Sequence, residues 1–177
     1  RNGVNEIQWH GESLLVRRAT HTAEDGFDLI ISNERAASLW SALIDAGAQP
    51  VGYETLETLR IEAGIARHGR DMDETNVVTE TNLDEAVSFT KGCYIGQEII
   101  VRIKHRGHVA KKLTGLRFDS QKQLPSGAVI KSTDDKEIGR ITSATVTPRL
   151  ARSVALGYVR FEFLGTGTAV KVVTDDG

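Results

Sequence analysis

The stretch Lys91-Gly92-Cys93-Tyr94-Ile95-Gly96-Gln97-Glu98 is the most distinctive part of this 177-residue sequence. Two glycines bracket the only cysteine of the chain, and glycine permits tight turns and the close approach of another group. The residues that follow, 97–103, predict a helix or a strand that starts just after Gly96. Up to about residue 106 the pattern mixes strands with helices, whereas from about residue 108 it is that of strands alone. The stretch therefore lies shortly before a change of fold class.

The upstream part is predicted to be a compact α+β unit. Residues 13–18 and 27–31 are typical of short strands, and a Glu-Asp-Gly turn separates them. Between Asn33 and Gly47, apolar residues recur at helical spacing, and the glycine is suited to a left-handed helix end. Residues 53–63 predict a second helix. We expect much of residues 66–96 to be ordered loop.

The downstream part is predicted to be a small antiparallel β-barrel, because short strand-like runs alternate with polar turns. These runs are residues 109–118, 128–131, 137–147, 153–159 and 169–173. We place the boundary at Arg106-Gly107. The prediction is an α+β domain over residues 1–106 and a β-barrel domain over residues 107–177.

Composition narrows the class of protein. The 22 basic and 24 acidic side chains give a net charge of −2, which provides no general attraction to nucleic acid or anionic membranes. A single cysteine cannot form an internal disulfide, and no apolar run approaches the roughly 20 residues that a membrane span needs. We expect a cytoplasmic protein with no nucleic-acid or membrane partner. Because the sequence begins with Arg1, we also expect a piece of a longer protein.

The cysteine is a candidate nucleophile. If residues 97–103 are helical, Cys93 lies near the positive end of the helix, and Lys91 adds a nearby cation. Both effects would lower the pKa of the thiol and favour the thiolate. The alternative is a buried cysteine that acts as a small apolar residue, and the spacing alone favours this alternative. A protease-type site would need a histidine base, and no known cysteine-protease pattern surrounds Cys93.

Other charged residues have simpler explanations. His105 and His108 are spaced to share a metal, but the basic segment 102–112 would repel a cation, so we predict no metal site. This segment lacks interleaved aromatic residues, and we expect it to be solvated or paired with the acidic stretch before it. Asp28 lies in a predicted strand, where an acid is usually part of the polar face. A carboxylate in a cleft can also accept two hydrogen bonds from an amidine-like edge.

Residues 91–98 resemble the K-G-C-Y-x-G-Q-E motif of the YgfZ-type folate-binding proteins, which belong to the glycine-cleavage T-protein (aminomethyltransferase) superfamily. Residues 22–28 resemble the Y-T-G-E-D-G-F-E segment of the T-proteins, and residues 59–64 and 69–73 are similar to further superfamily segments. The resemblance implies a partial ferredoxin-like folate-binding region followed by a C-terminal antiparallel β-barrel. It also implies an N-terminal part that this chain lacks.

The resemblance also implies roles for individual residues. Tetrahydrofolate is the implied cofactor, and Asp28 takes the place of the glutamate that holds the pterin in T-proteins. The resemblance assigns catalytic roles to Cys93 and Lys91. Further folate-binding roles fall on the remaining side chains of the motif region, namely Tyr94, Gln97, Glu98 and Arg102. The chain departs from T-proteins at Leu56, which stands where they have an arginine, and at Cys93, which they generally lack.

Three functions follow from this resemblance. The first is a tetrahydrofolate-binding protein that assists the assembly or repair of iron–sulfur enzymes, with a folate derivative and iron–sulfur client or assembly proteins as partners. The second is an aminomethyltransferase that transfers a one-carbon unit to tetrahydrofolate. The third is a non-enzymatic adaptor that uses the motif to bind a partner protein.

Overall fold

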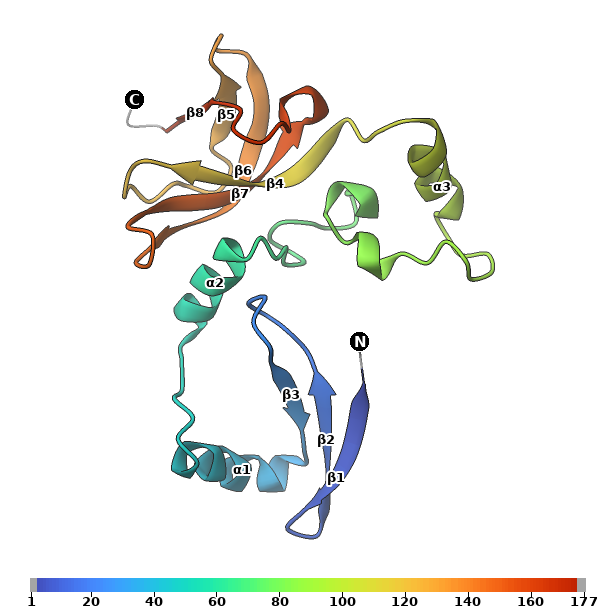
Figure 1. The fold of residues 1–177 in the computed structure, drawn as a ribbon, viewed down its shortest axis with the longest axis vertical. Coiled ribbons are helices and arrows are strands. Elements are labelled where there is room, and N and C mark those ends of the chain that lie inside the picture. Colours follow the sequence, from blue (N-terminus) through green and yellow to red (C-terminus); the bar gives the residue numbers. More distant parts are fainter. Residues whose placement is uncertain (1–2, 175–177) are drawn as a thin grey trace. The chain divides into compact units, whose positions relative to one another are not determined.

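The structure is a computed structural model that describes residues 3–174, apart from the side chain of Arg106. The predicted domains also include residues 1–2 and 175–177, which lie outside the described residues. The chain divides into two compact units, of which the first ends at Ala63 and the second begins at Gly64. Each unit is described by itself (Figure 1). The predicted boundary at Arg106-Gly107 stays a prediction.

A three-stranded antiparallel sheet opens the first unit. Its strands are β1 (Val4–Trp9), β2 (Glu12–Arg18) and β3 (Phe27–Ile30), in that spatial order. The last two confirm the predicted strands, whereas β1 was not predicted. His10 and Gly11 join β1 to β2 with φ angles of 51° and 83°, which is the geometry of a two-residue hairpin turn of type I′.

Two helices complete the first unit, and both were predicted. Helix α1 spans Asn33–Asp45, and helix α2 spans Tyr53–Glu62. Gly47 has a φ of 96°, and its N–H donates to the carbonyl of Ile44 at 2.9 Å. A residue with a side chain rarely adopts this left-handed backbone, so Gly47 ends α1 as the sequence predicts.

The second unit begins with a long ordered loop that contains two short 3₁₀ turns, η1 (Val78–Glu80) and η2 (Asp84–Ala86). Helix α3 (Gln97–Arg106) follows, and η1 lies against α3 and against the first strand of the next sheet. The side-chain amide of Asn82 donates a 2.6 Å hydrogen bond to the carbonyl of Leu113 in that strand. The predicted loop therefore has a fixed path because it is bonded to the sheet.

The remaining strands form one antiparallel sheet in the order β4-β7-β6-β5-β8, which is the predicted small barrel (Figure 1). Its strands are β4 (Lys111–Phe118), β5 (Val129–Ser132), β6 (Glu137–Thr147), β7 (Arg152–Arg160) and β8 (Val170–Val173), with the 3₁₀ turn η3 (Phe161–Phe163) between the last two. Ile130, Ile138, Ile141 and Val159 are buried in its core. The mixed α+β fold with a C-terminal barrel is confirmed.

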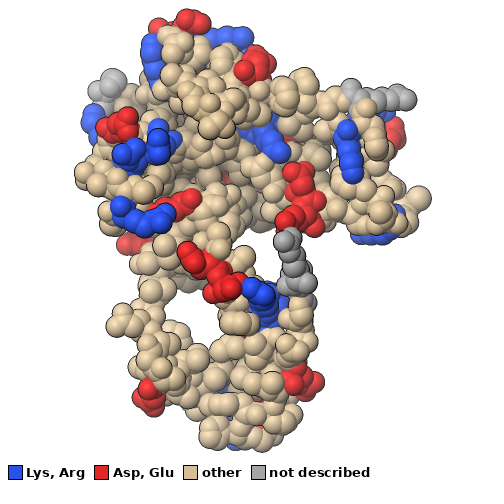
Figure 2. All heavy atoms as spheres, viewed as in Figure 1, with Lys and Arg blue, Asp and Glu red and all other residues tan. Residues whose placement is uncertain are grey.

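The apolar character of the helices and the distribution of surface charge, both taken over the described residues, bear on the class of protein. No helix among them is both long and apolar enough to cross a membrane. On the face shown in Figure 2, acidic and basic side chains are interspersed and do not gather into a patch of one sign. This mixture agrees with the net charge of −2.

Candidate functional site

The glycine-bracketed turn of residues 91–96 leads directly into helix α3, which confirms the helical alternative for residues 97–103. Gly96 caps the helix with a φ of 85°, a backbone that favours glycine. The N–H of Gln97 donates to the carbonyl of Tyr94 at 3.2 Å and closes the turn. Cys93 precedes the helix by four residues and is exposed. The alternative of a buried, apolar Cys93 is therefore wrong.

Lys91 and Tyr94 form a pair within this turn. The Lys91 Nζ lies 5.0 Å from the centroid of the Tyr94 ring, which is within the range of a cation–π interaction. The Tyr94 hydroxyl is buried and has no hydrogen-bond partner among the described residues. A buried hydroxyl without a partner is costly, so this atom is a candidate contact for a bound molecule or water. The catalytic roles of Lys91 and Cys93 stay predictions.

Glu98 and Arg102 interact with each other on α3. The Arg102 Nη2 donates to the Glu98 Oε1 at 2.7 Å, one helical turn apart, and both side chains are exposed. They line a shallow hollow of about 390 Å³ together with Val101 and His105. An exposed pair of this kind contributes about 0.3–0.5 kcal/mol, so an anionic ligand can displace Glu98 from Arg102 at little cost. Gln97 is partly buried at the start of the same helix.

The basic segment 102–112 also interacts with the acidic stretch, as the sequence predicts. The Lys112 Nζ lies 3.7 Å from the Asp84 Oδ2. His108 stacks on Phe161 with ring centroids 3.8 Å apart. Among the described residues, no group of three or more His, Cys, Asp or Glu side chains is arranged to hold a metal ion. Arg106 belongs to this segment, but its side chain lies outside the described part.

Asp28 lies on β3 in the first unit, directly opposite Arg17 on β2. Its Oδ2 accepts a hydrogen bond from the Arg17 Nε at 3.1 Å and a shorter one from the Arg17 Nη2. Its Oδ1 lies 2.8 Å from the His21 Nε2. The hydrogen bonds from His21 and from Arg17 lower the pKa of Asp28, because both stabilise the carboxylate. Asp28 is therefore a preorganised anion with a side chain that is 23% exposed.

Two polar residues of the second unit were missed by sequence reasoning. Asp71 is only 2% exposed, and its carboxylate accepts hydrogen bonds from the Thr142 hydroxyl at 2.5 Å and the Arg67 N–H at 3.0 Å. Tyr158 on β7 is 9% exposed, and its hydroxyl has no partner among the described residues. Burial, and then the charges of nearby carboxylates, raise the pKa of Tyr158 to about 12. Asp71 lies in the segment 69–73 that resembles the superfamily, but neither residue was singled out, since the contacts of both join distant segments.

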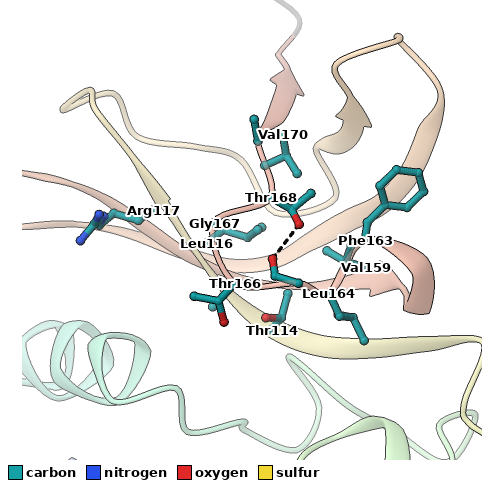
Figure 3. A pocket seen from close by; sticks show the side chains of 13 residues that line it. Thr114, Leu116, Arg117, Val159, Phe163, Leu164, Thr166, Gly167, Thr168 and Val170 are labelled. Atoms are coloured by element: carbon teal, nitrogen blue, oxygen red, sulfur yellow. Dashed lines mark hydrogen bonds between the residues drawn. The ribbon is translucent and has the colours of Figure 1, made fainter.

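The barrel itself has an opening between β4 and the segment 163–170, with a volume of about 600 Å³ (Figure 3). Threonine side chains, apolar groups and glycines line it, and Arg117 is the charged residue of the lining. Across the loop, the Thr168 hydroxyl donates to the Gly165 carbonyl at 2.6 Å. The lining holds no nucleophile with an adjacent base, so this opening provides space but no acid–base chemistry.

Comparison with known families matches most of the chain. The "GCVT N-terminal domain" family model matches residues 2–91, and the "Glycine cleavage T-protein C-terminal barrel domain" model matches residues 111–177. Residues 92–110, which hold most of the cysteine motif and all of α3, lie between the two matches. The two matches therefore agree with an N-terminal part and a C-terminal barrel, and Lys91 is the one residue of the motif that lies within a match.

Related proteins agree with this assignment. The chain is 32% identical to an aminomethyltransferase of Halothermothrix orenii over 92% of its own length and 46% of that protein. It is 34% identical to an aminomethyltransferase of Picosynechococcus over 93% of its length and 45% of that protein. A crystal structure of the glycine cleavage system aminomethyltransferase T from Bartonella henselae matches with a TM-score of 0.83 and 26% identity, over 93% of this chain and 46% of that one.

The chain thus spans slightly less than half the length of these relatives. The two family models between them cover most of its residues, and the first alone covers half. The order of the matches is also the order of the two predicted parts of the fold. The chain belongs to the glycine cleavage T-protein family.

Proposed function

We propose that this chain is part of a tetrahydrofolate-binding protein that transfers a one-carbon unit, in the manner of an aminomethyltransferase. The observation that carries the proposal is the similarity in fold to the Bartonella aminomethyltransferase along 93% of the chain. The names of the relatives from Halothermothrix and Picosynechococcus support the same activity. Since the chain covers less than half of each of these relatives, the activity of the whole protein is part of the proposal.

Asp28 is the residue of the first unit that suits a pterin. The amidine-like edge of a pterin presents two adjacent N–H donors, which a carboxylate can accept side by side. Arg17 already donates twice to Oδ2, whereas His21 is the one partner of Oδ1 among the described residues. A carboxylate oxygen accepts about two hydrogen bonds. One pterin donor therefore fits beside His21, and the second requires Arg17 to turn aside, which its exposure permits.

The motif supplies further candidate contacts within the second unit. The unpartnered hydroxyl of Tyr94 can donate to a ligand acceptor, and Gln97 offers both a donor and an acceptor at the start of α3. Arg102 becomes available to an anionic group when Glu98 is displaced. These roles are part of the proposal, as are those of Lys91 and Cys93.

The activity is tested with the full-length protein and the other purified components of a glycine-cleavage reaction. We expect the wild-type protein to form a one-carbon derivative of tetrahydrofolate, and Asp28→Asn to lower the rate because the neutral amide presents an N–H where the pterin needs an acceptor. Asp45→Asn on the exposed surface of α1 is the control. If the full-length protein binds tetrahydrofolate but forms no one-carbon derivative of it, this result contradicts the proposal of one-carbon transfer.

Residues 91–98 favour a second candidate function. Their match to the YgfZ-type motif is complete, and they place an exposed cysteine at a glycine-bracketed turn before α3. The second proposal is that the protein binds tetrahydrofolate and assists the assembly or repair of iron–sulfur enzymes, with Cys93 as the reactive group. Neither family model covers Cys93, so the motif alone carries this candidate.

Complementation separates the two candidates. Cells that lack the full-length protein receive the wild type, Cys93→Ala or Cys93→Ser, and both an iron–sulfur enzyme and the glycine-cleavage flux are measured. Recovery of the iron–sulfur activity with the wild type alone supports maturation. Equal recovery with Cys93→Ala contradicts a functional cysteine. A response of the glycine-cleavage flux alone supports aminomethyl transfer.

A further inference from the structure

His21 and Asp28 lie at the two ends of the segment that resembles the Y-T-G-E-D-G-F-E pattern of the T-proteins. When the segment is aligned with this pattern, His21 takes the place of the tyrosine and Asp28 takes the place of the glutamate. The chain therefore departs from the pattern at both ends. The structure joins these two positions, because the His21 Nε2 lies 2.8 Å from the Asp28 Oδ1.

His21 and Arg17 hold the Asp28 carboxylate at different oxygens. Arg17 donates to Oδ2 through two of its nitrogens, whereas His21 contacts Oδ1. An ionised carboxylate can only accept hydrogen bonds, so the His21 Nε2 is the donor in this contact. A carboxylate oxygen accepts about two hydrogen bonds, and Oδ1 therefore keeps one position for a ligand donor beside His21.

The charge of His21 decides how strongly Oδ1 can accept from a ligand. Histidine changes its charge between about pH 5 and pH 8. A neutral imidazole donates one hydrogen bond and leaves the negative charge of Asp28 to a pterin donor. An imidazolium neutralises that charge, so the same donor meets an ion pair and binds more weakly. Asp28 itself stays ionised throughout this range, because His21 and Arg17 lower its pKa.

The other charged groups around this pair do not change their charge in the same pH range. Arg17 keeps its positive charge, and the residue of β1 opposite Arg17 is the apolar Val4. None of the remaining charged side chains at the end of β2 and in the following turn forms a hydrogen bond with Asp28 in the described part of the chain. These side chains are Arg18, Glu24 and Asp25, of which the first and the last pair with each other.

We propose that His21 is a positioning residue of the pterin site and that its charge state makes tetrahydrofolate binding depend on pH. This inference rests on the proposed folate binding at Asp28. At neutral pH, His21 fixes Oδ1 and leaves one acceptor position to the pterin. At acidic pH, the imidazolium holds Oδ1 as an ion pair and the affinity falls. The His21 side chain is 62% exposed, so it exchanges protons with the solvent directly.

The test is anaerobic calorimetry of the full-length protein with tetrahydrofolate at pH 7.5 and pH 5.5, near the two ends of the range in which histidine changes its charge. We expect the wild type to bind about fivefold more weakly at pH 5.5, which is the difference between a charged and a neutral acceptor. His21→Gln keeps an N–H donor at a similar reach and cannot change its charge. This variant should bind as the wild type does at pH 7.5 and lose the fivefold difference.

Two further variants complete the test. His21→Ala removes the donor, so Asp28 is held by Arg17 alone, and tetrahydrofolate should bind about threefold more weakly at pH 7.5. His10→Asn is the control, because it removes the exposed histidine of the β1–β2 turn, and asparagine suits the left-handed backbone there. It should bind with the affinity and the pH dependence of the wild type. Ionisation of the ligand itself is the same for every variant.

The outcomes separate this inference from the proposed function. If tetrahydrofolate binds and the wild type and His21→Gln show the same pH dependence, the pH control by His21 is overturned and folate binding survives. If His21→Ala binds as tightly as His21→Gln at pH 7.5, the positioning role is overturned. If the wild type binds no tetrahydrofolate at either pH, the proposed function fails, and the inference fails with it.

Discussion

The Thr142 hydroxyl donates a 2.5 Å hydrogen bond to the carboxylate of Asp71, which lies 71 residues earlier in the sequence. Thr142 lies on β6 of the barrel, and Asp71 lies in the loop that opens the second unit. Because Asp71 is almost completely buried, its charge needs these hydrogen bonds. The bond therefore holds the long loop against the barrel.

Thr142→Val should lower the free energy of unfolding by about 1–2 kcal/mol, because it leaves one oxygen of a buried carboxylate without this donor. Chemical denaturation at neutral pH measures the change. Thr166→Val, in an exposed loop of the same unit, is the control and should change the free energy by less than about 0.5 kcal/mol. Equal effects of the two substitutions would show that the Thr142–Asp71 bond does not stabilise the unit.

The hydrogen bonds of Asp28 should be visible in its titration. His21 and Arg17 lower the pKa of this carboxyl below its ordinary value of about 3.9, so the ionised form is favoured in the folded state. The stabilisation is therefore present above about pH 4 and is lost as the pH falls through the folded-state pKa. Carboxyl ¹³C NMR should show the pKa of Asp28 rising in His21→Ala and in Arg17→Gln. Arg18→Gln is the control: Arg18 pairs with Asp25, so the pKa of Asp28 should stay unchanged in this variant. A pKa of Asp28 at or above 3.9 in the wild type contradicts the described pairing.

Ionisation of the Tyr158 hydroxyl should destabilise the fold at high pH. Its pKa is about 12 in the folded state, mainly because of burial and then because of Glu80, Asp71 and Asp73. In the unfolded chain it is about 10. The stabilisation from the neutral phenol is complete below pH 10 and is lost as the pH rises through 12.

Tyr158→Phe should remove this loss at high pH and change the free energy of unfolding at pH 7 by less than about 1 kcal/mol, because the hydroxyl has no hydrogen-bond partner in the described part of the chain. Tyrosinate absorbance and denaturation curves from pH 8 to 12 measure both effects. A Tyr158 that ionises near pH 10 in the folded protein contradicts its burial.

Gly139 allows the close approach of β6 to β7. A Cβ placed there would lie 2.0 Å from the carbonyl oxygen of Tyr158, which belongs to the backbone and cannot move aside. Gly139→Ala should therefore destabilise the barrel by about 3 kcal/mol. Gly115→Ala on β4 is the matched control, since no heavy atom lies within 4 Å of its added Cβ. Thermal unfolding of the two variants tests this, and similar midpoints would contradict the contact.

Local patterns predicted most of the elements but not the contacts between distant segments. Gly47 and the apolar spacing before it predicted the end of α1, and the turn residues of the barrel predicted its five strands. Strand β1 was not predicted, because its exposed Val4 and Ile7 are three residues apart and do not show the period-two alternation of a half-buried strand. The spacing of the motif alone favoured a buried Cys93, but the side chain is exposed. Residue spacing does not show which other segments pack against a turn.

The candidate site shows the same limit. The motif stands out in the sequence because two glycines bracket the only cysteine, whereas Asp28 was singled out by the family resemblance alone, since an acid in a strand is usually part of the polar face. Arg17 and His21 were not predicted as partners of Asp28, since the register of β2 against β3 brings them together. The cavity of about 370 Å³ between the η1–η2 loop, α3 and the start of β4 was not predicted either, because its lining joins residues from Thr79 to Phe161.

The most direct test of the account is the binding of tetrahydrofolate to the full-length protein, measured by anaerobic calorimetry. We predict saturable binding at one site, weakened about tenfold by Asp28→Asn because a charge-assisted hydrogen bond to the pterin is lost. Asp45→Asn should bind as the wild type does. No binding by the wild type, or equal binding by wild type and Asp28→Asn, would contradict the assignment of Asp28 to a folate site.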